Sequence, residues 1–138
     1  MVNKVKTVSL DYLQLHGNES IDTIKTLKSL LPDTGIIKAF NIKELSDFVK
    51  VDKYLPFVDL IILDSSNPGS GTSFDWNLIP DSLDKSKCLL SGGIGPDNVE
   101  KALNYGFVGL DLNSRLEKTK GIKDVALINE TFKLINNY

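Results

Sequence analysis

The feature that most constrains this chain is a short apolar run that ends on a carboxylate. Residues 60–63 read Leu-Ile-Ile-Leu, Asp64 follows them, and a loop rich in glycine and serine continues to residue 73. Four apolar residues without alternation predict a strand buried on both faces, as in a parallel sheet covered by helices. Because ligands bind beyond the carboxyl ends of such strands, Asp64 under a loop able to close is a candidate general acid.

Two further strand ends predict an anion site. The segment 88–90 leads into the pair Gly92 and Gly93, and Pro96 suits the first turn of a following helix. Paired glycines let backbone N–H groups approach an anion closely, and a helix N-terminus adds unpaired donors. The segment 107–112 ends in a similar polar turn. We therefore predict that one phosphate group is bound by backbone N–H groups around Gly92, Gly93, Asn113 and Ser114.

The composition describes one globular domain. The chain has 138 residues, which is long enough to bury a hydrophobic core. Its hydrophobic content of 41% and charged content of 25% are ordinary for a globular protein. A net charge of −2 without a basic run predicts no nucleic-acid partner and no membrane partner. The single cysteine excludes an internal disulfide and fits a cytoplasmic location, and one histidine with one cysteine does not suggest a zinc site. We expect neither a metal nor a cofactor.

The chain repeats a unit in which a strand is followed by a helical pattern. Strands are expected over five segments, 12–15, 36–40, 60–63, 88–90 and 107–112. Helices are expected over 21–31, after a capping box formed by Asn41 and Glu44, from Pro96 to Gly106, and over 125–135. Five such units predict an α/β fold with a parallel sheet. They fit a five-stranded doubly wound sheet or five units of an eight-stranded barrel, and spacing leaves both open.

Seven short motifs, taken in order, resemble phosphoribosylanthranilate isomerase, a (β/α)8 enzyme of tryptophan biosynthesis. They are Leu-Gln-Leu-His-Gly-Asn-Glu (13–19), Ile-Lys-Ala (37–39), Leu-Asp-Ser (63–65), Gly-Ser-Gly-Thr-Ser-Phe-Asp-Trp (69–76), Leu-Ser-Gly-Gly (90–93), Pro-Asp-Asn-Val (96–99) and Leu-Asp-Leu-Asn-Ser (110–114). The resemblance implies that 1–138 is a single partial TIM-barrel domain carrying strands four to eight. Strands one to three would come from a missing N-terminal segment or a second chain.

The resemblance also implies a reaction, the Amadori rearrangement of a phosphoribosyl compound of anthranilate to its 1-deoxyribulose phosphate isomer. This aldose-ketose isomerisation needs a general acid on the ring oxygen and a base at C2. The resemblance assigns the acid to Asp64, substrate contacts to His16, Gly71 and Asp111, and phosphate contacts to Gly92, Gly93, Asn113 and Ser114. The family's base is a cysteine on the first strand, which these residues do not contain. Cys88 opens its own strand and would lie at the opposite end of the barrel, so the isolated chain is expected to be inactive.

One residue departs from the family pattern inside the matched part. Arg115 stands where relatives usually have glycine, and its guanidinium is a candidate for direct phosphate contact. Five of the assigned residues also have a purely structural alternative: Asp64 as a turn residue, His16 as a hydrogen-bonded strand residue, Gly92 and Gly93 as a simple strand-to-helix turn, and Asp111 as the cap of a short helical turn.

Two other functions compete with the isomerase. In a signalling receiver domain, which also has five strands, Asp64 would be the phosphoacceptor. That function needs an acidic pair after the first strand and a lysine after the fifth, whereas Gln14 and His16 occupy the first place and Asp111 the second. The other alternative is a barrel remnant that binds a sugar phosphate without turnover.

Overall fold

The computed structural model of the chain describes residues 1–65 and 71–138. Its main sheet contains five parallel strands: β1 (Tyr12–Leu15), β2 (Gly35–Ile42), β3 (Leu60–Ser65), β4 (Cys88–Ser91) and β5 (Gly109–Asp111). All five predicted strands are present. β2 and β3 each run two residues further than expected, and β5 is shorter. The loop predicted to close over Asp64 includes residues 66–70, which lie outside the described residues.

Five helices accompany the strands in the described ranges: α1 (Val2–Val8), α2 (Ile21–Leu30), α3 (Asp47–Tyr54), α4 (Val99–Asn104) and α5 (Val125–Asn136). Short 3₁₀ turns lie at Leu55–Phe57, Trp76–Leu78, Lys85–Lys87 and Ser114–Leu116, and β6 (Glu117–Thr119) pairs with β7 (Ile122–Lys123) in an antiparallel hairpin. Among the described residues, none of these helices is long and apolar enough to cross a membrane.

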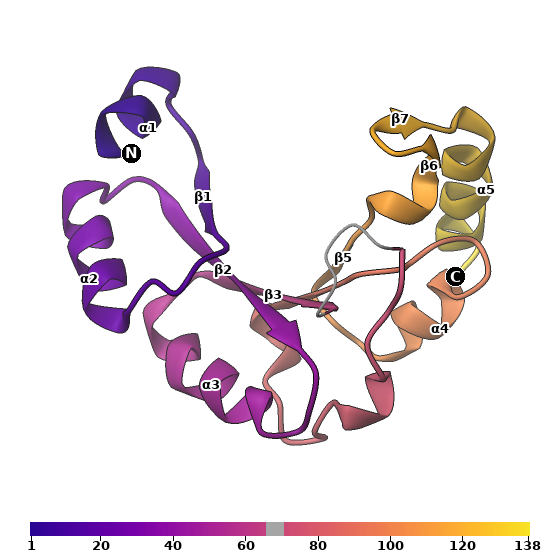
Figure 1. Ribbon diagram of the computed structural model, residues 1–138, viewed down its shortest axis with the longest axis horizontal. Helices are drawn as coiled ribbons and strands as arrows, with labels where there is room; N and C mark the ends of the chain where they lie inside the picture. The colour runs from indigo at the N-terminus through magenta and orange to yellow at the C-terminus, as the bar shows by residue number, and fades with distance from the viewer. Residues whose placement is uncertain (66–70) are drawn as a thin grey trace.

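The strand order excludes the doubly wound alternative. The strands lie side by side in sequence order, β1-β2-β3-β4-β5. A flavodoxin-like sheet has the order 2-1-3-4-5, which lets helices cover both of its faces. Figure 1 instead shows a curved sheet with α2, α3 and α4 along its outer side, and with α1 and α5 on the two arms of an open arc. The sheet therefore curves in one direction from β1 to β5.

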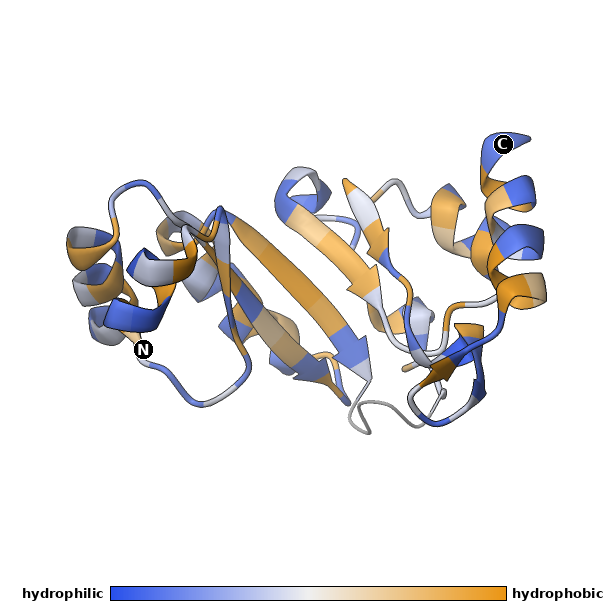
Figure 2. Cartoon of the chain, turned by 90° about the horizontal axis from the view of Figure 1, so that it is seen from above, coloured by the Kyte–Doolittle hydropathy of each residue, from blue (hydrophilic) through white to orange (hydrophobic). Residues whose placement is uncertain are grey.

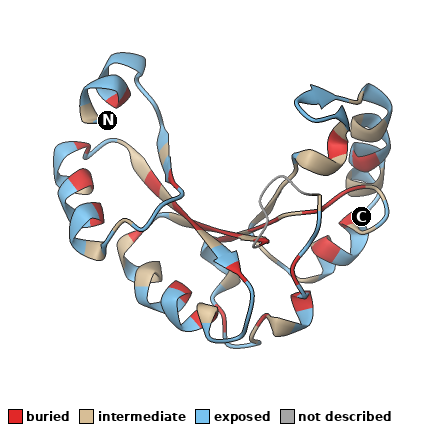
Figure 3. Ribbon diagram, viewed as in Figure 1, coloured by how far each residue is buried: buried red, intermediate tan, exposed pale blue. Residues whose placement is uncertain are grey.

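The hydrophobic core lies between the outer face of the sheet and the helices. Ile61 and Leu63 of β3 are completely buried and belong to one apolar cluster with Phe48 of α3 and Val99 of α4. Figure 2 shows the hydrophobic character of the strands, and Figure 3 shows buried residues along the strands and on parts of the helices. Because side chains alternate along a strand, the residues beside Leu63 and Ile61 face the inner side of the arc.

The predicted capping box is wrong. β2 continues to Ile42, so Asn41 lies within the strand and cannot cap a helix. α3 begins at Asp47, whose Oδ2 accepts hydrogen bonds from the backbone N–H groups of Lys43 (3.0 Å) and Glu44 (3.2 Å). The Asp47 carboxylate therefore closes the turn that the capping box was expected to close.

The expected start of α4 is wrong as well, whereas its end is confirmed. Pro96 precedes the helix, and Asn98 closes the turn by accepting from Gly95 N and donating to Gly93 O, both at 2.9 Å. Gly106 ends the helix with φ of 71°, a left-handed conformation that favours glycine.

The apolar stripe predicted for 125–135 is only half covered. Ile128 and Ile135 are partly buried, whereas Val125 is 70% exposed and Phe132 49% exposed. The buried residue of α5 is Thr131, whose Oγ1 donates to Leu127 O at 2.8 Å. α5 contacts α4 and the Ser114–Leu116 turn, but it stands at the end of the arc, and within residues 1–65 and 71–138 no other element covers its exposed side.

Candidate active site

A cavity of about 340 Å³ opens at the carboxyl ends of β1, β3, β4 and β5. All predicted site residues except Gly71 line it. Its lining comprises Gln14, His16, Asp64, Ser91, Gly92, Gly93, Asp111, Asn113 and Ser114. A larger cavity of about 500 Å³ lies near α1 at the amino ends of β1 and β2, opposite the end where ligands bind in α/β folds. The first cavity is therefore the candidate active site.

Parallel pairing brings its polar side chains together. Leu63 pairs with Leu90, so the next residues, Asp64 and Ser91, lie side by side. Ser91 in turn pairs with Asp111. Paired residues of a parallel sheet point to the same face, and because Leu63 faces the helices, these three residues face the inner side of the arc.

Asp64 is a half-buried carboxyl group. Burial raises its pKa above the ordinary aspartate value, and the negative charge of Asp111 adds to the rise. A hydrogen bond of 2.7 Å from Ser65 N to Asp64 Oδ1 and the charge of His16 act in the opposite direction. The net rise favours the protonated form, which is the form that donates a proton in general acid catalysis.

The glycine pair lets the backbone approach both the acid and the loop above it. Gly92 has φ of 85°, and a Cβ placed there would lie 2.5 Å from Asp64 Oδ1 and 2.9 Å from Ser65 N. Gly93 has φ of 66°, and its Cβ would lie 2.4 Å from Ser73 N. Any side chain at either position would displace a neighbour, so glycine is required here for packing as well as for backbone conformation.

His16 and Asp111 lie in the cavity wall and are also hydrogen-bonded. The Nε2 atoms of His16 and Gln14 are 2.7 Å apart. Ser91, which is buried, donates from Oγ to Asp111 Oδ2 at 3.3 Å. Asp111 makes no capping bond to the helical turn Ser114–Leu116, so the structural alternative for this residue is wrong. Sequence reasoning missed Gln14 and Ser91, although Gln14 stands two residues from His16 on the same strand face.

Gly71 and Arg115 lie outside the cavity lining, contrary to the expectation for Gly71. A Cβ on Gly71 would lie 3.3 Å from Arg115 Cδ, so the two residues pack against each other. The Arg115 guanidinium donates from Nη2 to Asp97 Oδ1 at 2.6 Å. Its partner in this structure is therefore a carboxylate of the β4–α4 turn, and it does not project into the predicted phosphate site.

Lys123 supports the predicted phosphate loop from the β6–β7 hairpin. Its Nζ donates to Asn113 O at 3.0 Å, contacts Asn113 Oδ1, and pairs with Glu117 Oε1 at 2.9 Å. These bonds fix the backbone at Asn113, which lines the cavity. Within the described ranges no group of three or more metal-ligating side chains occurs.

The sequence model described as "PRAI: N-(5'phosphoribosyl)anthranilate (PRA) isomerase" matches residues 1–134. The chain belongs to the phosphoribosylanthranilate isomerase family. Among curated members, it is 41% identical to the N-(5'-phosphoribosyl)anthranilate isomerase of Parabacteroides distasonis over 131 residues, which cover 91% of this chain and 58% of the relative. The Agrobacterium fabrum isomerase is 38% identical over 97% of this chain and 64% of the relative.

Solved structures of phosphoribosylanthranilate isomerases share the fold. The Thermotoga maritima enzyme superposes with a TM-score of 0.84 at 30% identity, covering 99% of this chain and 67% of that chain. An isomerase in complex with reduced 1-(o-carboxyphenylamino)-1-deoxyribulose 5-phosphate superposes with a TM-score of 0.75 at 25% identity, over 99% of this chain and 65% of that one. The chain thus spans about three-fifths of the length of the two curated isomerases.

Proposed function

We propose that this chain carries the general acid and the phosphate-binding part of a phosphoribosylanthranilate isomerase. The reaction converts N-(5-phosphoribosyl)anthranilate to its 1-deoxyribulose phosphate isomer in tryptophan biosynthesis, which we place in the cytoplasm. The observation that carries this proposal is the convergence of Asp64, with its raised pKa, and the turns at Gly92–Gly93 and Asn113–Ser114 on one cavity in a chain of this family.

The residues present supply one half of the chemistry. Asp64 donates its proton to the ring oxygen as the C1–O bond of the furanose breaks, and the anthranilate nitrogen supplies the electron pair that forms the iminium ion. Removal of the C2 proton then gives the enamine, which tautomerises to the ketose. Backbone N–H groups at Gly92, Gly93, Asn113 and Ser114 bind the phosphate, and His16 and Asp111 contact the rest of the substrate.

The base that removes the C2 proton comes from outside these 138 residues. Cys88 is completely buried at the start of β4, far from the carboxyl ends of the strands. Burial raises the pKa of its thiol to about 12, so the thiolate is not populated near neutral pH. Cys88 is therefore a small apolar core residue and takes no part in the reaction.

We further propose that the chain forms strands four to eight of an eight-stranded barrel. β1 and β5 each pair with one neighbour only, which leaves two open edges in the described sheet. Apolar side chains are exposed at both arms of the arc, including Val8, Leu10 and Tyr12 near β1 and Phe132 on α5. Strands one to three, from an upstream segment or a second polypeptide, would pair with both edges and cover these side chains.

A fused protein tests the proposed function. It joins strands one to three of the Parabacteroides distasonis isomerase, with the helices between them, ahead of this chain, whose α1 supplies the helix before β1. It is expressed in a bacterial strain that needs tryptophan because it lacks the isomerase. We expect growth without tryptophan, because the fused barrel contains both the acid and the family's base. A folded fusion that supports neither growth nor turnover in vitro would contradict the isomerase and favour a sugar-phosphate-binding remnant. Phosphorylation of Asp64 by acetyl phosphate and Mg²⁺ would instead favour a receiver domain.

A further inference from the structure

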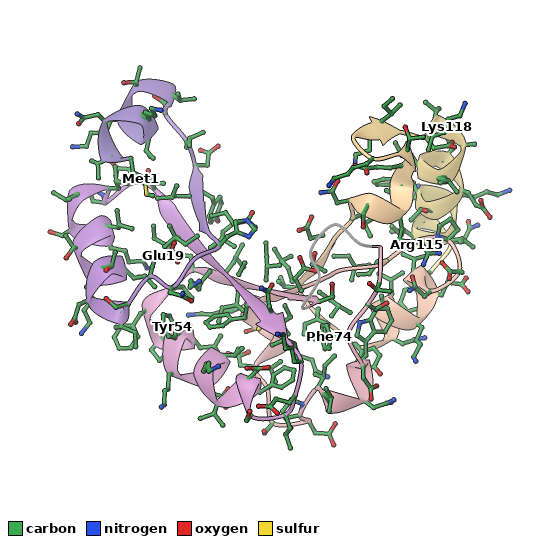
Figure 4. All side chains as sticks on the ribbon, viewed as in Figure 1. Met1, Glu19, Tyr54, Phe74, Arg115 and Lys118 are labelled. Carbon is green, nitrogen blue, oxygen red and sulfur yellow. The ribbon has the colours of Figure 1, made fainter. Side chains whose placement is uncertain are left out.

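A third cavity, of about 350 Å³, lies beside the active site at the carboxyl ends of β1 and β2. It shares His16 with the active site, and its other lining residues include Gly17, Glu19, Lys38 and Tyr54. Figure 4 shows Glu19 and Tyr54 on the same arm of the arc, in the region of α2 and α3. The two cavities therefore meet at His16, and the turn that follows it lines the third cavity.

Lys38 is an unusual residue for its place in β2. It pairs with Leu15 of β1 and Ile61 of β3, which are both buried core residues, and its side chain is only 4% exposed. An apolar side chain would suit a position between two apolar neighbours. A buried ammonium group needs several partners to offset its loss of hydration, so its presence in the core calls for a reason other than hydrophobic packing.

The partners of Lys38 belong mainly to the turn after His16. Its Nζ donates to Gly17 O at 2.8 Å and to Ala39 O at 3.1 Å, and it pairs with Glu19 Oε2 at 3.2 Å. Glu19 Oε1 accepts from Gly17 N at 3.1 Å. Both polar groups of the Gly17 backbone are therefore bound, one by Lys38 and the other by Glu19.

Tyr54 completes the network from α3. Its hydroxyl donates to the backbone O of Glu19 at 3.0 Å, and its ring packs edge-on against Phe40 of β2, with 5.3 Å between ring centroids. The turn from Gly17 to Glu19 is thus held to both β2 and α3. A turn fixed at this many points leaves little freedom to the residue immediately before it.

We propose that Lys38, acting through Gly17 and Glu19, is a positioning residue that sets the orientation of His16 in the active site. His16 directly follows β1 and has only one side-chain hydrogen bond among the described residues, to Gln14. The buried network fixes the peptide on its carboxyl side, so the imidazole is presented to the cavity next to Asp64. Lys38 itself does not line that cavity.

The catalytic use of the His16 orientation rests on the proposed function. The orientation itself can be tested without enzyme turnover. His16 is the only histidine of the sequence. The ¹⁵N NMR signals of its two ring nitrogens can therefore be recorded in the ¹⁵N-labelled 138-residue chain without overlap from other imidazoles. In Lys38→Met we expect these signals to shift toward those of a freely rotating imidazole. Glu19→Gln keeps an acceptor for Gly17 N but loses the ion pair, so a smaller shift in the same direction is expected.

In the fused protein, Lys38→Met should raise KM by about fivefold with a smaller change in kcat.

Lys28→Met is the matched control. Lys28 Nζ also forms an ion pair of 3.2 Å, with Asp59, but this pair joins α2 to the turn before β3 and does not touch the His16 turn. It should leave the His16 signals in place. Unchanged signals in a folded Lys38→Met chain would overturn the inference. If that variant does not fold, unchanged signals in Glu19→Gln would overturn it, and so would an equal shift in Lys28→Met.

Discussion

In the fused protein, replacing Asp64 by asparagine is expected to lower kcat by at least about 100-fold, the scale of losing acid catalysis. Asparagine keeps the size of the side chain and an oxygen that accepts from Ser65 N, but it cannot donate a carboxyl proton. The measurement is steady-state turnover of the phosphoribosyl substrate. Asp59→Asn is the control, because Asp59 accepts from Ile36 N and pairs with Lys28 away from the active-site cavity. Near-normal kcat in Asp64→Asn would remove this residue from the mechanism.

The raised pKa of Asp64 gives this prediction a pH signature. The acid acts in its protonated form, so its contribution to kcat is present at low pH and is lost as the pH rises through the raised pKa. Folding also favours the protonated form. The free energy of unfolding therefore decreases as the pH rises from the ordinary aspartate pKa through the raised pKa of Asp64. Asp64→Asn should abolish this decrease.

Replacing Gly92 by alanine is expected to have the second largest effect. The added Cβ would meet the Asp64 carboxylate at 2.5 Å, and φ of 85° is strained for alanine. We expect the free energy of unfolding to fall by about 1–3 kcal/mol. We also expect kcat of the fused protein to fall by about 10- to 100-fold, because a displacement near 1 Å can misalign the acid.

Gly106→Ala separates the two consequences. Gly106 has a similar φ of 71°, but nothing lies within 4 Å of the position its Cβ would take. This variant should lose stability through backbone strain while keeping kcat. If Gly92→Ala loses stability to the same extent and keeps full kcat, the close approach of the glycine turn to Asp64 is irrelevant to catalysis.

The sequence predicted those parts of the site that follow from strand order alone. Asp64 and Asp111 lie at the carboxyl ends of β3 and β5, and parallel pairing alone places both beside Ser91, which the sequence analysis did not single out. The helix starts were harder, because the extension of β2 to Ile42 removed Asn41 from the predicted cap. That extension depends on pairing with β3, which is a tertiary interaction.

The supporting contacts could not be predicted in the same way. Lys123 reaches Asn113 only because the unpredicted β6–β7 hairpin folds back on the turn before it. Lys38 was visible as a charge within an apolar strand, yet its partners Gly17 and Glu19 lie about twenty residues away in the chain and depend on the β1–β2 pairing. Nothing in the described part of the chain covers the exposed apolar side chains of α5 and β1, which is why we propose further strands.

The most direct test of the account is turnover by two separate polypeptides, this chain and a fragment carrying strands one to three of the Parabacteroides distasonis isomerase. The account predicts no detectable turnover by either polypeptide alone and measurable turnover on mixing, because the open edges of β1 and β5 would pair with the fragment and bring the base to Asp64. Robust turnover by a monodisperse monomer of the 138-residue chain alone would contradict the account.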